Sequence, residues 1–366
     1  MYTSNIEREY ELGKLGRGRG LSMGPGLAHV SHDLGGVQRG RIYVIASEPK
    51  VGKSTLCDVG FVIEPWLDAL AKGIPLKIIY FSLELDLLGK TFDWIAHFMW
   101  RESGMLEMSG VPLSGNLLRG RVADAHGAPV RLTPEVEALM FKVYRERVIP
   151  LLGEYDERGQ RICEGAIDFV TRSGTPEELF QYLGRWAGKL GAFTRDARGQ
   201  ACGYQPHQEQ QHVIVVVDHM RKLRVGAGQR RKDAMDRFME LSVAMRNLCG
   251  WTFVEIVHTN RSVSELGRIK QFQDELYPHS DDIKDSGNLA EEADYVLTMF
   301  NPNDGKYGLR RHFGVELRGM NGQPLEPNLR TIHLVENRHG PFPQHFKVRM
   351  HGGVKAFERM RKGMET

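Results

Sequence analysis

Cysteine is scarce in this chain of 366 residues, and none of Cys57, Cys163, Cys202 and Cys249 belongs to a CxxC pair. A disulfide framework or a thiolate zinc site is therefore disfavoured, and reduced thiols in a cytoplasmic protein are the simpler interpretation. The 14 histidines show no ligand spacing such as HExxH, which leaves a transition-metal site without support.

Long apolar runs are also missing. No stretch approaches about 18 uninterrupted apolar residues, the length that crosses a bilayer as a helix. The first twenty residues, MYTSNIEREYELGKLGRGRG, are polar and charged and lack the apolar core of a secretion signal. We therefore expect a cytoplasmic protein with no membrane partner.

A strong net charge is the third absence, because 49 Lys and Arg residues face 46 Asp and Glu residues and leave only +3. This balance is too weak to indicate a nucleic-acid partner, which must instead be argued from where the cations cluster. Hydrophobic residues make up 41% and charged residues 26% of the chain. That composition predicts a folded core rather than disorder.

Short apolar runs with strand character alternate with helical patterns. The clearest of these strands are RIYVIA (41–46), KIIYFSLEL (77–85), VIVVVD (213–218), TFVEIVHTN (252–260) and YVLTMF (295–300). Strands that alternate with helices predict an α/β fold with a mostly parallel sheet flanked by helices. TIHLVENR and HFKVRM near the C-terminus predict β-hairpins.

The remaining segments divide the chain. Residues 1–30, which include the Gly-rich GRGRG segment, are expected to form an N-terminal arm or linker, and residues 31–366 the main domain. Residues 101–212 separate the second strand from VIVVVD and predict an insertion. Its polar stretches, GEYDERGQR (153–161) and RDARGQACGYQPHQEQQ (195–211), are expected to be surface loops.

A phosphate-binding loop follows the first strand. It fits GxxxxGK[ST], except that serine replaces the first glycine, and its residues are Ser47, Glu48, Pro49, Lys50, Val51, Gly52, Lys53, Ser54 and Thr55. The motif requires backbone N–H groups and a helix N-terminus facing phosphate, a lysine for the β/γ-phosphates and a hydroxyl for Mg²⁺. Gly52, Lys53 and Ser54 stand in register between a strand and a helix. The sequence therefore predicts ATP and Mg²⁺ as ligands.

Two carboxylates are candidates for the chemistry beside this loop. Asp218 ends the VIVVVD strand, where a Walker B carboxylate would hold Mg²⁺ together with Ser54; capping the next element is the alternative role. Glu84 lies at the tip of KIIYFSLEL. Strand tips beside a P-loop converge on one crevice, so Glu84 is the candidate general base, with a merely solvated glutamate as the alternative.

Together these motifs resemble the motor domain of the DnaB-type replicative helicases, which are RecA-like P-loop ATPases. LGGVQRGRIYVIASEPKVGKST is similar to the opening of that family, FSLEL to its SLEM motif and VVVDHMRKLR to its Walker B segment. VHTNRSV is similar to its SQLNRSV motif, DDIKDSGNLAEEADYVLTMF to its DLRESG…IEQDAD stretch and ENRHGP to its KNRxGP motif. The match covers about residues 30–350 in the correct order.

The resemblance assigns further roles. It implies that Glu84 is the catalytic glutamate, that Asp218 is the metal-associated carboxylate and that His258 occupies the position of the γ-phosphate-sensing Gln. It also implies that Arg338 is an arginine finger reaching the γ-phosphate of the neighbouring subunit. Glu336 stands where the family has a Lys, so the site between subunits departs from the family pattern.

Cations cluster after Asp218. Six of them lie within 12 residues, around two glycines, and they are Arg221, Lys222, Arg224, Arg230, Arg231 and Lys232. A flexible cationic loop suits contact with a phosphate backbone, although a solvated cationic face is the alternative. Arg261 and Lys284 lie in other stretches of the family match and complete the predicted contacts to single-stranded DNA. Neither the cationic loop after Asp218 nor the stretch that contains Lys284 has side chains suited to reading bases, so we expect DNA binding that is independent of sequence.

The resemblance implies an ATP-driven 5′→3′ helicase in DNA replication, a homo-oligomeric, hexameric ring whose partners are single-stranded DNA and a primase or helicase loader. Because accessory N-terminal domains are missing from the sequence, we expect a phage or mobile-element origin in a bacterial host. Two alternatives stay open. One is a RecA- or RadA-like recombinase that forms filaments, and the other is a degenerate ATPase that serves as a scaffold or loader partner.

Overall fold

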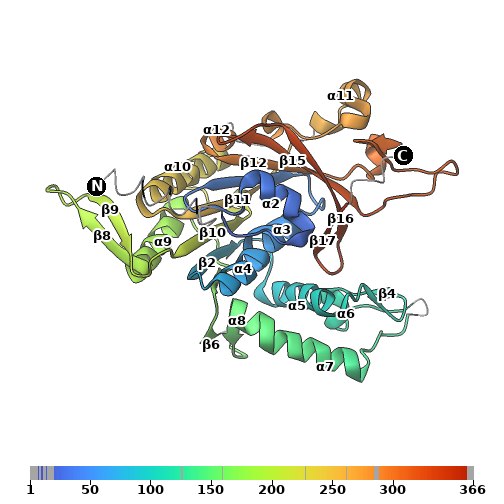
Figure 1. Cartoon of the computed structure of the whole chain (residues 1–366), viewed down its shortest axis with the longest axis horizontal. Coiled ribbons are helices and arrows are strands. Elements are labelled where there is room, and N and C mark those ends of the chain that lie inside the picture. Colours follow the sequence, from blue (N-terminus) through green and yellow to red (C-terminus); the bar gives the residue numbers. More distant parts are fainter. Residues whose placement is uncertain are drawn as a thin grey trace.

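The structure, a computed structural model, describes residues 20–124, 127–158, 160–226, 228–260, 262–283 and 288–360, together with Glu7, Tyr10 and Lys14. Within these residues, nine strands form a central sheet with helices on both faces (Figure 1). In spatial order they are β17 (Ala356–Arg359), β16 (Gln344–His351), β15 (Leu329–Asn337), β12 (Tyr295–Phe300), β1 (Ile42–Ser47), β11 (Thr252–His258), β10 (His212–Asp218), β2 (Leu76–Ser82) and β7 (Ile167–Val170).

Strand direction confirms the predicted α/β architecture. The strands from β12 to β7 run parallel, whereas β15, β16 and β17 extend the sheet in antiparallel pairs. The C-terminal hairpins predicted from the sequence are these antiparallel strands. Strand β10 ends at Asp218 as predicted, but β2 ends at Ser82 and leaves Glu84 in the loop beyond it.

The central strands are apolar on both faces because helices cover both. In β1, Tyr43 and Ile45 pack in one hydrophobic cluster, while Ile42, Val44 and Ala46 pack in the other. A parallel strand buried in this way forms a continuous apolar run in the sequence rather than an alternating one. These strands can therefore be predicted from their amino-acid composition alone.

Two sets of helices form the outer layers. The first face is covered by η1 (Pro25–Leu27), α2 (Ala28–Leu34), α3 (Lys53–Cys57), the π-helical segment η2 (Asp58–Ile63), α4 (Glu64–Lys72) and α5 (Leu87–Ser103). The second is covered by α9 (Pro176–Leu190), α10 (Arg231–Cys249) and α12 (Asn288–Glu292). Helix α9 begins with a capping box in which Thr175 and Glu178 each accept a hydrogen bond from the other's backbone N–H.

Residues 20–30, which we expected to belong to the N-terminal arm, are packed into the core. Leu21, Met23, Leu27 and Val30 are each 2% exposed or less, and Leu21 forms an antiparallel bridge with Val37. Leu27, Val30 and Leu34 follow the i, i+3, i+7 spacing of a helix, which α2 confirms. The expectation of an arm overlooked this short pattern, whereas Leu21 and Met23 lie before it among Gly, Ser and Pro residues.

The region between β2 and β10 contains more than an insertion. Below the sheet in Figure 1, α5 packs with α6 (Gly115–Leu118), α7 (Pro134–Val143), the π-helical segment η3 (Tyr144–Val148) and α8 (Ile149–Leu152) in a helical lobe. A two-stranded sheet of β3 (Glu107–Met108) and β4 (Val111–Pro112) lies at its end. The chain then returns to the central fold, because β7 pairs with β2 and α9 covers the second face.

The two polar stretches expected as surface loops are β-hairpins. Strand β5 (Gly153–Tyr155) pairs with β6 (Arg161–Glu164), and β8 (Gly191–Arg195) pairs with β9 (Ala201–Pro206) in a hairpin that projects on the left of Figure 1. Both turns have the sequence Asp-x-Arg-Gly-Gln. In each, the aspartate carboxylate accepts backbone N–H groups two and four residues further on. This turn chemistry is the signal that the sequence reading missed.

The remaining elements are short. They are the helical turns η4 (Met220–Lys222), η5 (Ser262–Ser264), η6 (Gln273–Glu275), η7 (Ser280–Asp282) and η8 (Gly305–Tyr307), the helix α11 (Leu266–Phe272) and the pair β13 (Arg311–His312) and β14 (Val315–Glu316). Among the residues that the structure describes, no helix combines the length and apolar character required to cross a bilayer.

Candidate nucleotide site

The phosphate-binding loop lies between β1 and α3, as its sequence predicts. Pro49 and Lys50 form its exposed tip, and Gly52 has a φ of 122°. This φ favours glycine, and a Cβ atom at Gly52 would lie 2.3 Å from the sulfur of Met350, which would then have to move. Helix α3 begins at Lys53, and its first-turn N–H groups are the donors that bind phosphate in such loops.

Side chains from distant segments hold this loop in place. Glu48 accepts hydrogen bonds from Lys306 and, at 3.0 Å, from the Tyr307 hydroxyl. The Arg330 Nε on β15 donates to the Val51 carbonyl at 3.2 Å. Sequence reasoning missed these anchors, because their partners lie more than 250 residues away and follow no local pattern.

Ser54 and Asp218 meet at the predicted metal position. The Ser54 hydroxyl donates to Asp218 Oδ1 at 3.3 Å, and Asp218 is only 1% exposed. A hydroxyl and a carboxylate are hard oxygen ligands of the kind that Mg²⁺ binds, so the residues fit this ion. Thr55 is buried in the same helix turn.

Lys53 lies among carboxylates at this edge of the sheet. Burial lowers the pKa of its ammonium group, and the charges of Asp218 and Glu84 oppose that shift. Glu84 thus faces the same region as Lys53, although it belongs to the exposed loop after β2. The three predicted groups come together as the strand order requires.

A cavity of about 400 Å³ opens beside these groups. Its lining comprises Glu84, His219, Arg221, Lys222, Leu223, Arg231 and His258. His258 Nδ1 lies 3.3 Å from the Ser47 carbonyl, which can only accept, so Nδ1 carries the proton. Burial and the nearby Lys53 lower the pKa of His258. His258 therefore offers an unprotonated Nε2.

The cations predicted to contact DNA divide into groups. Arg221, Lys222 and Arg231 line the cavity that contains Glu84. Arg224 instead pairs with both carboxylate oxygens of Glu178, at 2.7 and 2.8 Å, and Arg230 pairs with Asp233.

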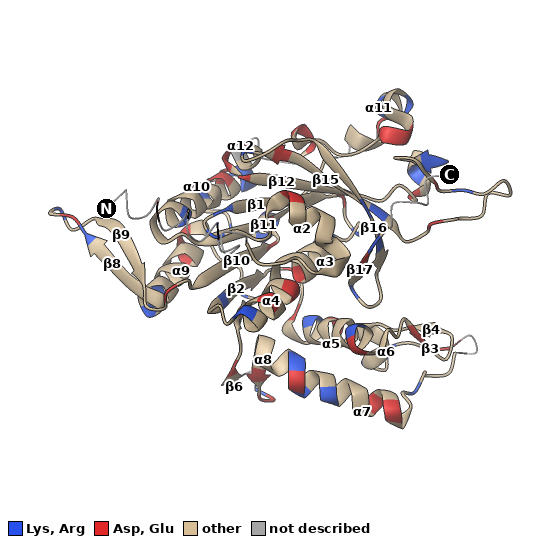
Figure 2. Cartoon of the chain, viewed as in Figure 1, with Lys and Arg blue, Asp and Glu red and all other residues tan. Residues whose placement is uncertain are grey.

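Lys232 is exposed at the start of α10. Arg261 and Lys284 lie outside the described residues. Figure 2 shows Lys and Arg spread over many elements and interspersed with carboxylates, rather than gathered on one helix or strand.

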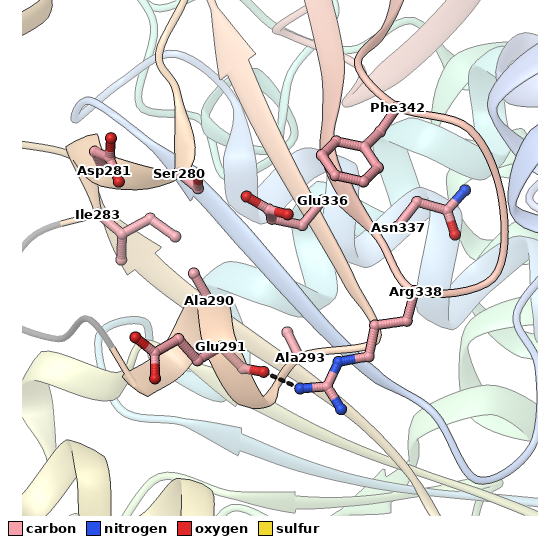
Figure 3. Close-up of a pocket in the computed structure, with 10 residues that line it drawn as sticks. All are labelled: Ser280, Asp281, Ile283, Ala290, Glu291, Ala293, Glu336, Asn337, Arg338 and Phe342. Atoms are coloured by element: carbon pink, nitrogen blue, oxygen red, sulfur yellow. Dashed lines mark hydrogen bonds between the residues drawn. The ribbon is translucent and has the colours of Figure 1, made fainter.

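Arg338 lies apart from this crevice, directly after β15 (Figure 3). Its guanidinium donates to the Glu291 carbonyl, and its backbone N–H donates to the Asp294 carbonyl at 3.0 Å. It lines a second cavity, of about 510 Å³, whose rim includes Glu336 and the half-exposed ring of Phe342. Within one chain, Arg338 is therefore not part of the phosphate site.

The fold is similar to solved structures that include the following two. The ATPase domain of G40P superposes with a TM-score of 0.65 at 13% identity, over 99% of both chains. The chain has a RecA-like α/β fold. A DnaB-like replicative helicase, described with its interactions with primase, gives a TM-score of 0.64 at 13% identity, over 97% of this chain and 68% of that chain. No family model matches the sequence, and no curated protein matches it.

Proposed function

We propose that this chain is an ATP-driven DNA helicase of the DnaB type that acts in DNA replication. The observation that carries the proposal is the convergence of Lys53, Ser54, Asp218 and Glu84 on one edge of a RecA-like sheet. The ATPase domain of G40P matches that sheet and its surroundings from end to end. The DnaB-like neighbour, at 13% identity, gives the same fold.

In this mechanism the P-loop N–H groups and Lys53 hold the β- and γ-phosphates of ATP. Ser54 and Asp218 would hold Mg²⁺, which would supply positive charge beside the phosphates. Glu84 orients the attacking water and takes its proton. His258 joins the P-loop carbonyl of Ser47 to the cavity that contains Glu84, which suits a residue that responds to the γ-phosphate.

We further propose a hexameric ring that moves 5′→3′ on single-stranded DNA. Arg338 supports this assembly, because its position at the opposite end of β15 from the P-loop contact of Arg330 suits an arginine that acts on a neighbouring subunit. The proposed contact to the DNA backbone is formed by Arg221, Lys222, Arg231 and Lys232. A primase or a helicase loader is the proposed protein partner.

A strand-displacement assay on forked DNA tests this function. ATP and Mg²⁺ should support separation of a fork that carries a free 5′ tail, while a substrate with only a 3′ tail should remain paired. Electron micrographs with single-stranded DNA should show rings. Filaments together with strand exchange would favour a recombinase, and an absence of ATP hydrolysis with and without DNA would favour a scaffold.

A further inference from the structure

A buried polar cluster lies directly behind Asp218. Its members are Asp58 of η2, Tyr80 of β2 and Lys90 of α5, which are 5%, 0% and 1% exposed. The Lys90 ammonium lies 2.8 and 2.7 Å from the two carboxylate oxygens of Asp58, and 2.8 Å from the Tyr80 hydroxyl. It also lies 3.6 Å from Asp218 Oδ2. A lysine buried this deeply is rare unless it is paired.

Two carboxylates contact this lysine. Its ammonium lies 2.7 Å from Asp58 Oδ2 and 3.6 Å from Asp218 Oδ2, so it pairs with both. Lys53 is a second cation whose charge interacts with Asp218.

Tyr80 contacts both carboxylates of this site. Its hydroxyl lies 2.8 Å from Asp58 Oδ1 and 3.3 Å from Asp218 Oδ2. Lys90 donates to the Tyr80 oxygen at 2.8 Å, so the hydroxyl proton is left for one of the two carboxylates. Tyr80 therefore bridges Asp58 and Asp218.

Asp218 thus has two oxygens with different neighbours. Oδ1 faces the Ser54 hydroxyl at the metal position, whereas Oδ2 faces Tyr80 and Lys90. Groups that hold the outer oxygen of a metal-binding carboxylate fix its orientation. The segment that carries Glu84 is held on both sides. Before it, the Leu83 N–H donates to the Asp218 carbonyl at 2.7 Å. After it, Lys90 lies in the first turn of α5.

We propose that Tyr80 and Lys90 are positioning residues for Mg²⁺-dependent hydrolysis. They hold Asp218 so that Oδ1 remains available to the metal, and Lys90 fixes the segment that carries Glu84 against the same aspartate. The inference rests on the proposed ATPase function. It adds two residues that neither touch the nucleotide nor belong to the P-loop, Walker B or arginine-finger motifs.

Tyr80→Phe tests the proposal with a change of one hydroxyl. We expect the Mg²⁺ concentration at half-maximal ATP turnover to rise about tenfold, the low end of what outer-shell substitutions cost in metal affinity. The Mg²⁺ concentration that gives half of the ADP-dependent rise in melting temperature should shift equally, while ADP binding without Mg²⁺ stays unchanged. Tyr43→Phe is the control, because Tyr43 is a buried β1 tyrosine bonded to Gly36 and Gln38 instead.

Lys90 requires a paired variant, because Lys90→Met alone leaves Asp58 buried without its cation. The double variant Asp58→Asn/Lys90→Met removes both charges, so it should fold even where Lys90→Met alone does not. Its Mg²⁺ midpoint should still shift by the same factor as that of Tyr80→Phe. If both variants fold and show the wild-type Mg²⁺ midpoint, the cluster only stabilises the fold and the proposal is overturned. If the wild-type protein shows no Mg²⁺-dependent stabilisation by ADP, the proposed ATPase function fails, and this inference with it.

Discussion

The two ends of the parallel strands differ in how their charged groups are held. At the C-terminal end, Lys53 and Asp218 are buried, and side chains from several elements fix the loop around them. At the other end, Arg338 contacts a backbone carbonyl at the rim of a cavity, beside Phe342, which is 51% exposed. The groups at the first end are buried and hydrogen-bonded, whereas Arg338 at the other end is exposed.

Strand register shows why these ends cannot cooperate within one chain. Asn337, just before Arg338, pairs with Tyr295 at the start of β12, while Ser47 pairs with Met299 near its end. Four residues of strand separate those levels, which is about 13 Å along the sheet at roughly 3.3 Å per residue. The guanidinium also points towards Glu291. Variants at Lys53 and Arg338 can show whether the first end is complete by itself and whether the second acts on a neighbouring subunit.

The largest effect is expected at the buried end. Lys53→Ala removes the charge-assisted contact to the β/γ-phosphates, so ATP turnover should be abolished while circular dichroism and melting temperature show a folded protein. Lys72→Ala, in the exposed last turn of α4, is the matched control and should hydrolyse ATP normally. Near-normal phosphate release by the Lys53 variant would show that this loop is not the ATP site.

Arg338→Ala tests the open end. If Arg338 stabilises charge on the phosphoryl group of an adjacent subunit, its loss should lower the rate of hydrolysis by about 10³–10⁵-fold. Nucleotide binding should be unchanged, because no P-loop contact is removed. Arg311→Ala, at an exposed arginine of β13, should retain activity.

Mixing sharpens this test. Lys53→Ala and Arg338→Ala proteins are each expected to be inactive alone, but mixed rings contain interfaces with one intact P-loop and one intact arginine. Such mixtures should regain partial ATPase activity. If mass measurements show mixed oligomers that remain inactive, the two ends do not cooperate between subunits and the trans role of Arg338 is wrong.

Glu84→Gln should have a smaller effect. The amide keeps the shape and hydrogen bonding of the side chain but loses its basicity, so kcat should fall by about 10²–10⁴-fold while ATP still binds. Glu240→Gln, at an exposed position of α10, is the control. A Glu84 variant that fails to bind ATP, or that hydrolyses it at the wild-type rate, contradicts its role as the base.

The same contrast explains what the sequence could reveal. Burial on both faces makes continuous apolar runs of β1, β10, β11 and β12, so these strands could be predicted from the sequence. The P-loop could be predicted because its motif residues are consecutive in the sequence. Strand β7 could not be predicted, since it is a short edge strand with a polar residue, Asp168, that binds Trp186. The roles of Glu84, His258 and Arg338 remain predictions that their positions agree with.

Non-local pairs account for most of the rest. Arg330 with Val51, Lys306 with Glu48 and Lys90 with Asp218 join residues that are far apart in the sequence. Motifs mark Val51, Glu48 and Asp218, but no periodicity or motif marks their partners, because each pair exists only once the sheet has formed. The burial of Leu21 and Met23 was missed for the same reason, since their partners come from other elements.

The smallest effect is expected from a single cation beside the crevice. Lys232 is exposed at the start of α10, next to Arg231, which lines the cavity that contains Glu84. If Lys232 contacts one phosphate, Lys232→Ala should make the plot of log association constant against log salt concentration less steep by about 0.7 for single-stranded DNA. Lys142→Ala, on the distant helix α7, should leave both affinity and slope unchanged. Fluorescence anisotropy with a labelled oligonucleotide over a salt series measures both variants. Equal slopes for Lys232→Ala and the wild type would exclude a phosphate contact at Lys232, and the DNA path would then have to run elsewhere on the protein.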